Sequence, residues 1–272
     1  MSLRSRLPDP ALPSTSEDSM PSHLLTRPEL RAAPMRLPVL LPAVLLLFTA
    51  LPALALEPAE ADQRIDRLCG TFHGVAPQGG PEPLKWLEEM KDDPEPYTDR
   101  LNERLEPARV DAAAGDPVAL RRLLCATGLL GALKHDRALE MLEARASKLR
   151  GERLVRQKTL DTFRATLGPK SEPKEHDRLR FYMNVLSAFL AVERAAVGTL
   201  SEAGDARLAP LLVKWLQGSE RHLWHEYVDS LEVTSKGTPE VDEPLMALMK
   251  DPKRDRGLRR RLSVYFYGGQ GK

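Results

Sequence analysis

Residues 115–131 read GDPVALRRLLCATGLLG, and this stretch decides the fold class. Gly115 can end one helix, Asp116 can cap the next, and Pro117 suits the first turn of that helix. The apolar residues that follow recur at helical spacing on two sides, Leu120, Leu123, Leu124 and Leu130 on one and Val118, Cys125 and Leu129 on the other. A helix that is apolar on two sides is typical of an inner position between other helices.

The same periodicity continues on both sides of this stretch, and past residue 80 no run of alternating strand residues occurs. Further helices are predicted near residues 135–149, 152–167, 176–200, 205–217, 219–233, 242–250 and 256–267. Gly and Pro mark the breaks between most of them. The sequence therefore predicts an all-α domain over residues 81–268. Residues 56–80 are expected to be a loop-rich linker, and residues 269–272 a flexible tail.

Some of these helices repeat a pattern. GDARLAPLL at residues 204–212 and EPLMALMKDP at residues 243–252 each begin a helical hairpin. LRRRL at residues 258–262 follows the hairpin start at residues 243–252 and lies in its second helix. LRRLL at residues 120–124 and VRQKTL at residues 155–160 show the same second-helix pattern.

Over roughly residues 110–268 the chain thereby resembles the HEAT-like repeat family. The resemblance implies a short right-handed array of antiparallel helical hairpins, an α-solenoid, whose groove or edge binds another protein. It brings no catalytic residues. The helix over residues 176–200 is long for such a unit, and its apolar stripe fits an irregular bundle equally well.

The most apolar stretch of the chain reads MRLPVLLPAVLLLFTALPALALEPAE at residues 35–60. Arg36 precedes an uncharged run that ends in a small-x-small motif at Ala55. These features predict a signal peptide over residues 35–55, cleaved after Ala55, and export to the periplasm or to the extracellular space. The alternative is that residues 37–56 remain as a membrane anchor and tether the protein.

Residues 1–34 are rich in Pro and Ser and are expected to be disordered. A second hypothesis is that these residues are not part of the translated protein. Translation would then start at Met35 instead of Met1, because Met35 stands where a signal peptide begins.

Both cysteines, Cys69 and Cys125, follow the predicted cleavage site. In an oxidising compartment they can form a disulfide, which would contribute about 4 kcal/mol by closing a long loop. Alternatively, Cys125 packs as a small free hydrophobe beside Leu129. The sequence leaves both possibilities open.

The charges of the chain are balanced, with 40 basic and 39 acidic residues and a formal net charge of +1. Such a chain has no general attraction to nucleic acid. Basic residues do cluster near the C-terminus, at Lys250, Lys253, Arg254, Arg256, Arg259, Arg260 and Arg261. We interpret this cluster as a solvated helix face, with a site for an anion or a lipid headgroup as the alternative.

The strongest candidate for a catalytic or metal-binding site is formed by His222, His225, Glu226 and Asp229, since helical spacing would place all four on one face. Imidazole and carboxylate groups are ligands of zinc, which suggests a metal-dependent hydrolase. The HExxH motif of zinc proteases fails, however, because Asp229 stands where the second His is required. We therefore expect this face to be the solvated side of an amphipathic helix.

Together these features predict an exported, non-enzymatic helical-repeat protein that serves as a protein–protein interaction scaffold. No cofactor and no nucleic acid is expected, and the partner is expected to be a protein. A membrane is involved only if the signal segment is retained. The alternative function is the metal-dependent hydrolase built on the His222 to Asp229 face.

Overall fold

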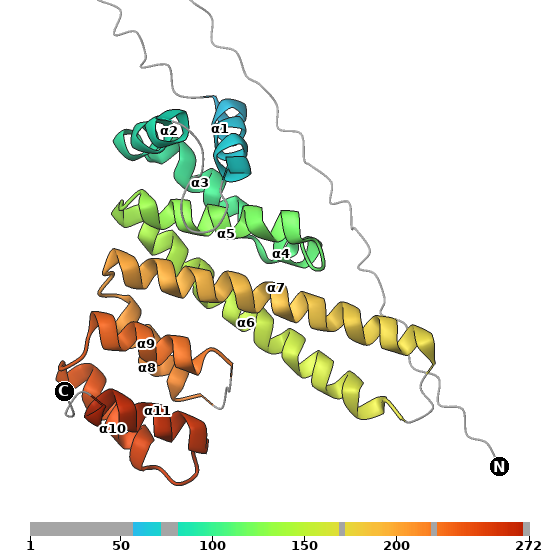
Figure 1. Ribbon diagram of the computed structural model, residues 1–272, viewed down its shortest axis with the longest axis vertical. Helices are drawn as coiled ribbons and strands as arrows, with labels where there is room; N and C mark the ends of the chain where they lie inside the picture. Colours follow the sequence, from blue (N-terminus) through green and yellow to red (C-terminus); the bar gives the residue numbers. More distant parts are fainter. Residues whose placement is uncertain (1–56, 72–80, 169–171, 219–221, 269–272) are drawn as a thin grey trace, which may run out of the picture. The chain divides into compact units, whose positions relative to one another are not determined.

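Eleven α-helices and no strands make up the part of the chain that the computed structural model describes, residues 57–71, 81–168, 172–218 and 222–268 (Figure 1). The predicted all-α class is confirmed for these residues. The predicted signal peptide with Ala55, the alternative anchor at 37–56, the N-terminal residues 1–34 and the tail at 269–272 lie outside them.

The N-terminal part contains four helices, α1 (Pro58–Thr71), α2 (Pro81–Asp92), α3 (Glu95–Arg104) and α4 (Pro107–Ala112). The expectation of a loop-rich linker over residues 56–80 is wrong for α1. Its buried side chains recur at helical spacing and pack into the core, at Ala61, Ile65, Leu68 and Cys69. Gly70 lies in the last turn of this helix, while Gly74, Gly79 and Gly80 of the same segment lie outside the described residues.

Helix α5 (Pro117–Ala132) begins as the sequence predicts. Gly115 has a φ of +84°, a conformation that glycine adopts without strain. An Asp116 carboxylate oxygen accepts hydrogen bonds from the backbone N–H groups of Val118 at 2.8 Å and Ala119 at 3.1 Å. Both apolar sides of α5 are largely buried, with the exception of Val118, which is 48% exposed.

The two longest helices are α6 (Asp136–Thr166) and α7 (Pro173–Ala203), which run side by side (Figure 1). The predicted helices 135–149 and 152–167 are one continuous helix, so the expected break is wrong. Gly151 lies at this point, and a single glycine lowers helix stability by only about 1 kcal/mol, which tertiary packing overcomes. Helix α7 ends at Gly204, whose φ is +71°.

The C-terminal helices are α8 (Leu208–Leu216), α9 (Trp224–Thr234), α10 (Pro239–Lys250) and α11 (Arg256–Tyr267). Each overlaps a predicted helix. Helix α8 packs against α9 and α10, while α11 packs against α9 and α10. Helix α9 also lies against α7, and this contact connects the C-terminal helices to the long pair.

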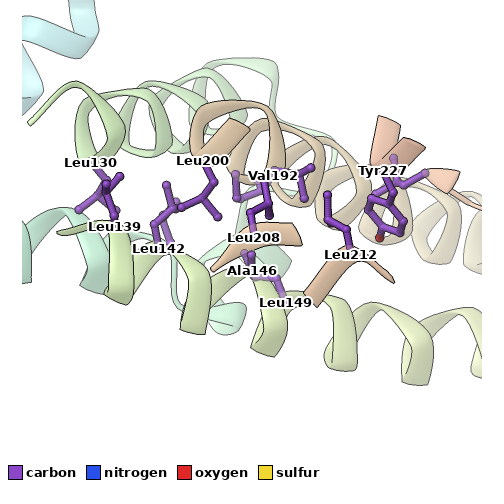
Figure 2. Packing of buried hydrophobic residues seen from close by; sticks show 14 of the residues in the cluster. Leu130, Leu139, Leu142, Ala146, Leu149, Val192, Leu200, Leu208, Leu212 and Tyr227 are labelled. Atoms are coloured by element: carbon purple, nitrogen blue, oxygen red, sulfur yellow. The ribbon is translucent and has the colours of Figure 1, made fainter. Parts of the chain in front are cut away.

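A continuous hydrophobic core connects these elements. Figure 2 shows its central part, where side chains from α5 to α9 meet, including Leu130, Leu139, Leu142, Ala146, Leu149, Val192, Leu200, Leu208, Leu212 and Tyr227. Burial of such aliphatic side chains contributes about 1.5–3 kcal/mol each and is the main force that holds the helices together.

Cys69 of α1 and Cys125 of α5 form a disulfide bond, with a Cα–Cα distance of 5.6 Å. Of the two possibilities that the sequence left open, the structure therefore contains the bridge. Polar contacts fix the same end of the molecule, because Arg104 of α3 pairs with Asp62 at 3.0 Å and with Asp66 at 2.5 Å on α1.

By length and composition alone, α7 is a candidate membrane span among the described helices. Half of its most apolar window is buried inside the protein. Glu193, in the middle of this helix, is fully buried against protein groups.

Candidate functional site

The structure does not bring the four predicted metal-ligating residues together. His222 lies outside the helix, since Leu223 has a φ of +60° and α9 begins only at Trp224. The expected helix start near residue 219 is thus wrong. The His225 ring stacks on Trp224, with ring centroids 3.5 Å apart.

The two carboxylates of this set are each paired with an arginine. Glu226 forms an ion pair with Arg194 of α7 at 2.6 Å. Asp229 forms one with Arg261 of α11 at 2.5 Å. Among the described residues, no group of three or more His, Cys, Asp or Glu side chains is arranged to hold a metal ion. These carboxylates therefore connect helices, and the geometry does not support the hydrolase.

Part of the basic C-terminal cluster also has a packing role. Arg261 pairs with Glu232 of α9 at 2.7 Å in addition to Asp229. Arg254 donates a hydrogen bond to the backbone oxygen of Gly218 at 2.8 Å. These two arginines hold neighbouring segments together, so the cluster is not simply a solvated helix face.

A more distinctive surface lies on the long helical pair. We call residues 154–166 of α6 and 173–183 of α7 the distal segment. Three large apolar side chains of this segment are exposed, with 62% of Val155, 56% of Phe181 and 44% of Met183 accessible to solvent. Phe181 and Met183 are two positions apart and therefore lie on different sides of α7, so the exposed apolar side chains cover more than one side of the distal segment. Several large exposed apolar side chains on neighbouring helices are typical of a segment that contacts a partner.

Contacts between the two helices hold this segment in shape. The rings of Phe163 and Tyr182 meet edge to face, with centroids 5.4 Å apart. The guanidinium of Arg178 lies 5.2 Å from the Phe163 ring centroid, and its Nε donates to the Tyr182 hydroxyl at 3.0 Å. The exposed apolar side chains are thus carried by an ordered pair of helices, which lowers the entropic cost of binding.

A buried polar network lies at the base of the distal segment. Arg153 of α6 and Glu193 of α7 are both fully buried, and Arg153 Nε donates to Glu193 Oε2 at 2.5 Å. The Tyr227 hydroxyl of α9 donates to the other oxygen of the same carboxylate. Next to this network, the guanidinium of Arg156 lies 4.3 Å from the Phe189 ring centroid.

Sequence reasoning did not identify either feature. An aromatic residue on an apolar helical stripe is typical of a core position, yet 56% of Phe181 is accessible to solvent. Met183 continues an apolar stripe that is buried at Leu186, so periodicity alone does not separate the covered part from the exposed part. Glu193 does leave a signal, since it interrupts an apolar run at a position on the buried side of the helix.

The chain was compared with models of protein families, with curated proteins and with solved structures. None of the three comparisons found a match.

Proposed function

We propose that this protein is an exported, non-enzymatic helical-repeat protein that binds another protein through its distal segment. The observation that carries the proposal is the exposure of Val155, Phe181 and Met183 on one ordered helical pair. Exposure of these apolar side chains to water is unfavourable by about 25 cal/mol for each Å² of surface. A partner that covers them removes this surface from water, which favours binding. Basic side chains such as Arg164 and Arg180 are exposed nearby, which favours a partner with an acidic rim.

The proposed architecture is the array of antiparallel hairpins that the HEAT-like resemblance implies. The pairing of α8 with α9 and of α10 with α11 supports it for the C-terminal helices. Helices α6 and α7 are longer than ordinary repeat helices. In this proposal their extra length is the part that binds the partner.

Export is the second part of the proposal, with cleavage after Ala55. The disulfide between Cys69 and Cys125 supports it, because such bonds persist in oxidising compartments such as the periplasm or the extracellular space.

Affinity isolation of the exported protein tests both parts. The wild-type protein is compared with Phe181→Ser/Met183→Ser, and with the control Val233→Ser/Val264→Ser. The control replaces apolar side chains that are also exposed but lie on α9 and α11. A partner retained by the wild type and the control but lost by the first variant supports the proposal. A partner retained equally by all three proteins contradicts the assignment of the surface.

The N-terminus of the isolated protein is sequenced in the same experiment. A start at Leu56 supports export with cleavage after Ala55. A protein that retains residues 37–56 instead supports the anchored alternative and contradicts cleavage.

A further inference from the structure

A hollow of about 380 Å³ lies among the N-terminal helices, where α1, α3, α4 and α5 meet. Its polar lining consists of Asp66, Arg104, Arg109 and Arg122, one from each of these helices. Leu123 and three alanines complete the lining with apolar surface. Small-molecule sites commonly have volumes of about 300–1,000 Å³ and this combination of apolar walls with a few polar groups.

The charges around this hollow are unbalanced, with three arginines and one aspartate. Arg104 is largely occupied by Asp62 and Asp66, yet its Nε is buried and has no hydrogen-bond partner among the described residues. Arg109 and Arg122 are exposed, and neither side chain forms a hydrogen bond or ion pair with a described residue. Guanidinium groups that are free to bind therefore line the hollow from two separate helices.

We propose that this hollow binds a small organic anion through carboxylate or phosphate groups. Arginine presents planar pairs of N–H donors that match both groups, and two arginines on different helices can hold an anion from two sides. The alanine and leucine surface suits the carbon skeleton of such a ligand. The disulfide joins α1 to α5, and the Arg104 ion pairs join α3 to α1, so these three helices are fixed around the hollow before a ligand arrives.

Calorimetric titration of the full exported chain tests this site, with citrate as the carboxylate probe and inorganic phosphate as the phosphate probe. The variant Arg109→Ala/Arg122→Ala removes two exposed side chains that form no hydrogen bond or ion pair with a described residue, so its fold is expected to be unchanged. The matched control is Arg256→Ala/Arg260→Ala, which removes the same charge from exposed positions on α11. Circular dichroism confirms that all proteins are folded.

Saturable binding of at least one probe is expected for the wild type and the control. The affinity is expected to fall at least tenfold in Arg109→Ala/Arg122→Ala. In Asp66→Asn the affinity is expected to rise several-fold, since this removes a negative charge that pairs with Arg104 and repels an anion in the hollow. The probe that binds more tightly identifies the anionic group. Absence of saturable binding by both probes, or equal affinities in the two arginine variants, overturns the proposal.

Discussion

Arg153 and Glu193 form an ion pair in which both side chains are fully buried, and the carboxylate also accepts a hydrogen bond from Tyr227. Helices α6, α7 and α9 therefore meet at a single buried ion pair. Removing two charges from water costs several kcal/mol, which their attraction only roughly offsets. The network thus fixes the positions of three helices more than it adds to stability.

Loss of one partner leaves the other charge buried. We expect Glu193→Gln to lower the free energy of unfolding by about 3–5 kcal/mol. The triple variant Arg153→Met/Glu193→Leu/Tyr227→Phe removes the polar network and is expected to lose less. Urea unfolding measures both, and a triple variant that is the less stable of the two contradicts this account.

Close packing between α5 and α7 depends on Gly131. A Cβ atom at this position would overlap the methyl group of Thr199 on α7. Gly131→Ala is therefore expected to lower the free energy of unfolding by about 1–3 kcal/mol. Gly128, one turn earlier in α5, has open space around it, and Gly128→Ala is expected to raise stability by about 0.5–1 kcal/mol. Equal effects of the two substitutions in thermal unfolding would refute this packing.

The disulfide closes a loop between residues 56 positions apart in the sequence. Its loss in Cys69→Ala/Cys125→Ala is expected to lower the free energy of unfolding by about 4 kcal/mol. Hydrogen exchange is expected to increase most in α1, because α1 then remains attached mainly by surface ion pairs and by the small apolar face that it buries. An increase confined to the C-terminal helices would contradict this role.

Glu106 gives stability a defined pH dependence. Hydrogen bonds from Arg145 at 2.7 Å, then from Lys148 at 2.9 Å, lower the pKa of this carboxyl from its ordinary value of 4.5 to about 2. In the unfolded chain the carboxyl takes up its proton near the ordinary value. Its stabilising effect is therefore complete above pH 4.5 and is lost as the pH falls towards 2.

The comparison with Glu106→Gln isolates this effect. The wild type is expected to unfold at a higher urea concentration at pH 6, and the difference is expected to shrink steadily between pH 4.5 and pH 2. A difference that is the same at all these pH values would show that the charge of Glu106 is not its cause.

Much of the fold could be predicted from local patterns. The Gly115-Asp116-Pro117 turn and the apolar spacing of α5 determine their own structure, because a left-handed glycine, a capping carboxylate and a proline at the first turn act within a few residues. Helices α8, α10 and α11 are also close to their predicted positions, whereas α9 ends near its predicted end but begins five residues later than predicted. The disulfide was one of two open possibilities, since pairing depends on which helices meet.

The rest depends on tertiary contacts that no local pattern records. Helix α1 lies in a segment that glycines made look like a loop, and α6 continues past Gly151 because α7 packs along it. The apolar stripe of α7 contains both Met183 and Leu186, but only Leu186 is buried in the fold. The metal hypothesis depended on a helix start that Leu223 does not allow.

The most direct test of the central claim is site-specific photocrosslinking in the compartment to which the protein is exported. A photoreactive amino acid is placed at Phe181 in one protein and at Val233 in another, two exposed positions on different helices. The account predicts a discrete crosslink to one partner protein from position 181 and none from position 233. Crosslinks from 233 alone, or no crosslink from 181, would contradict it.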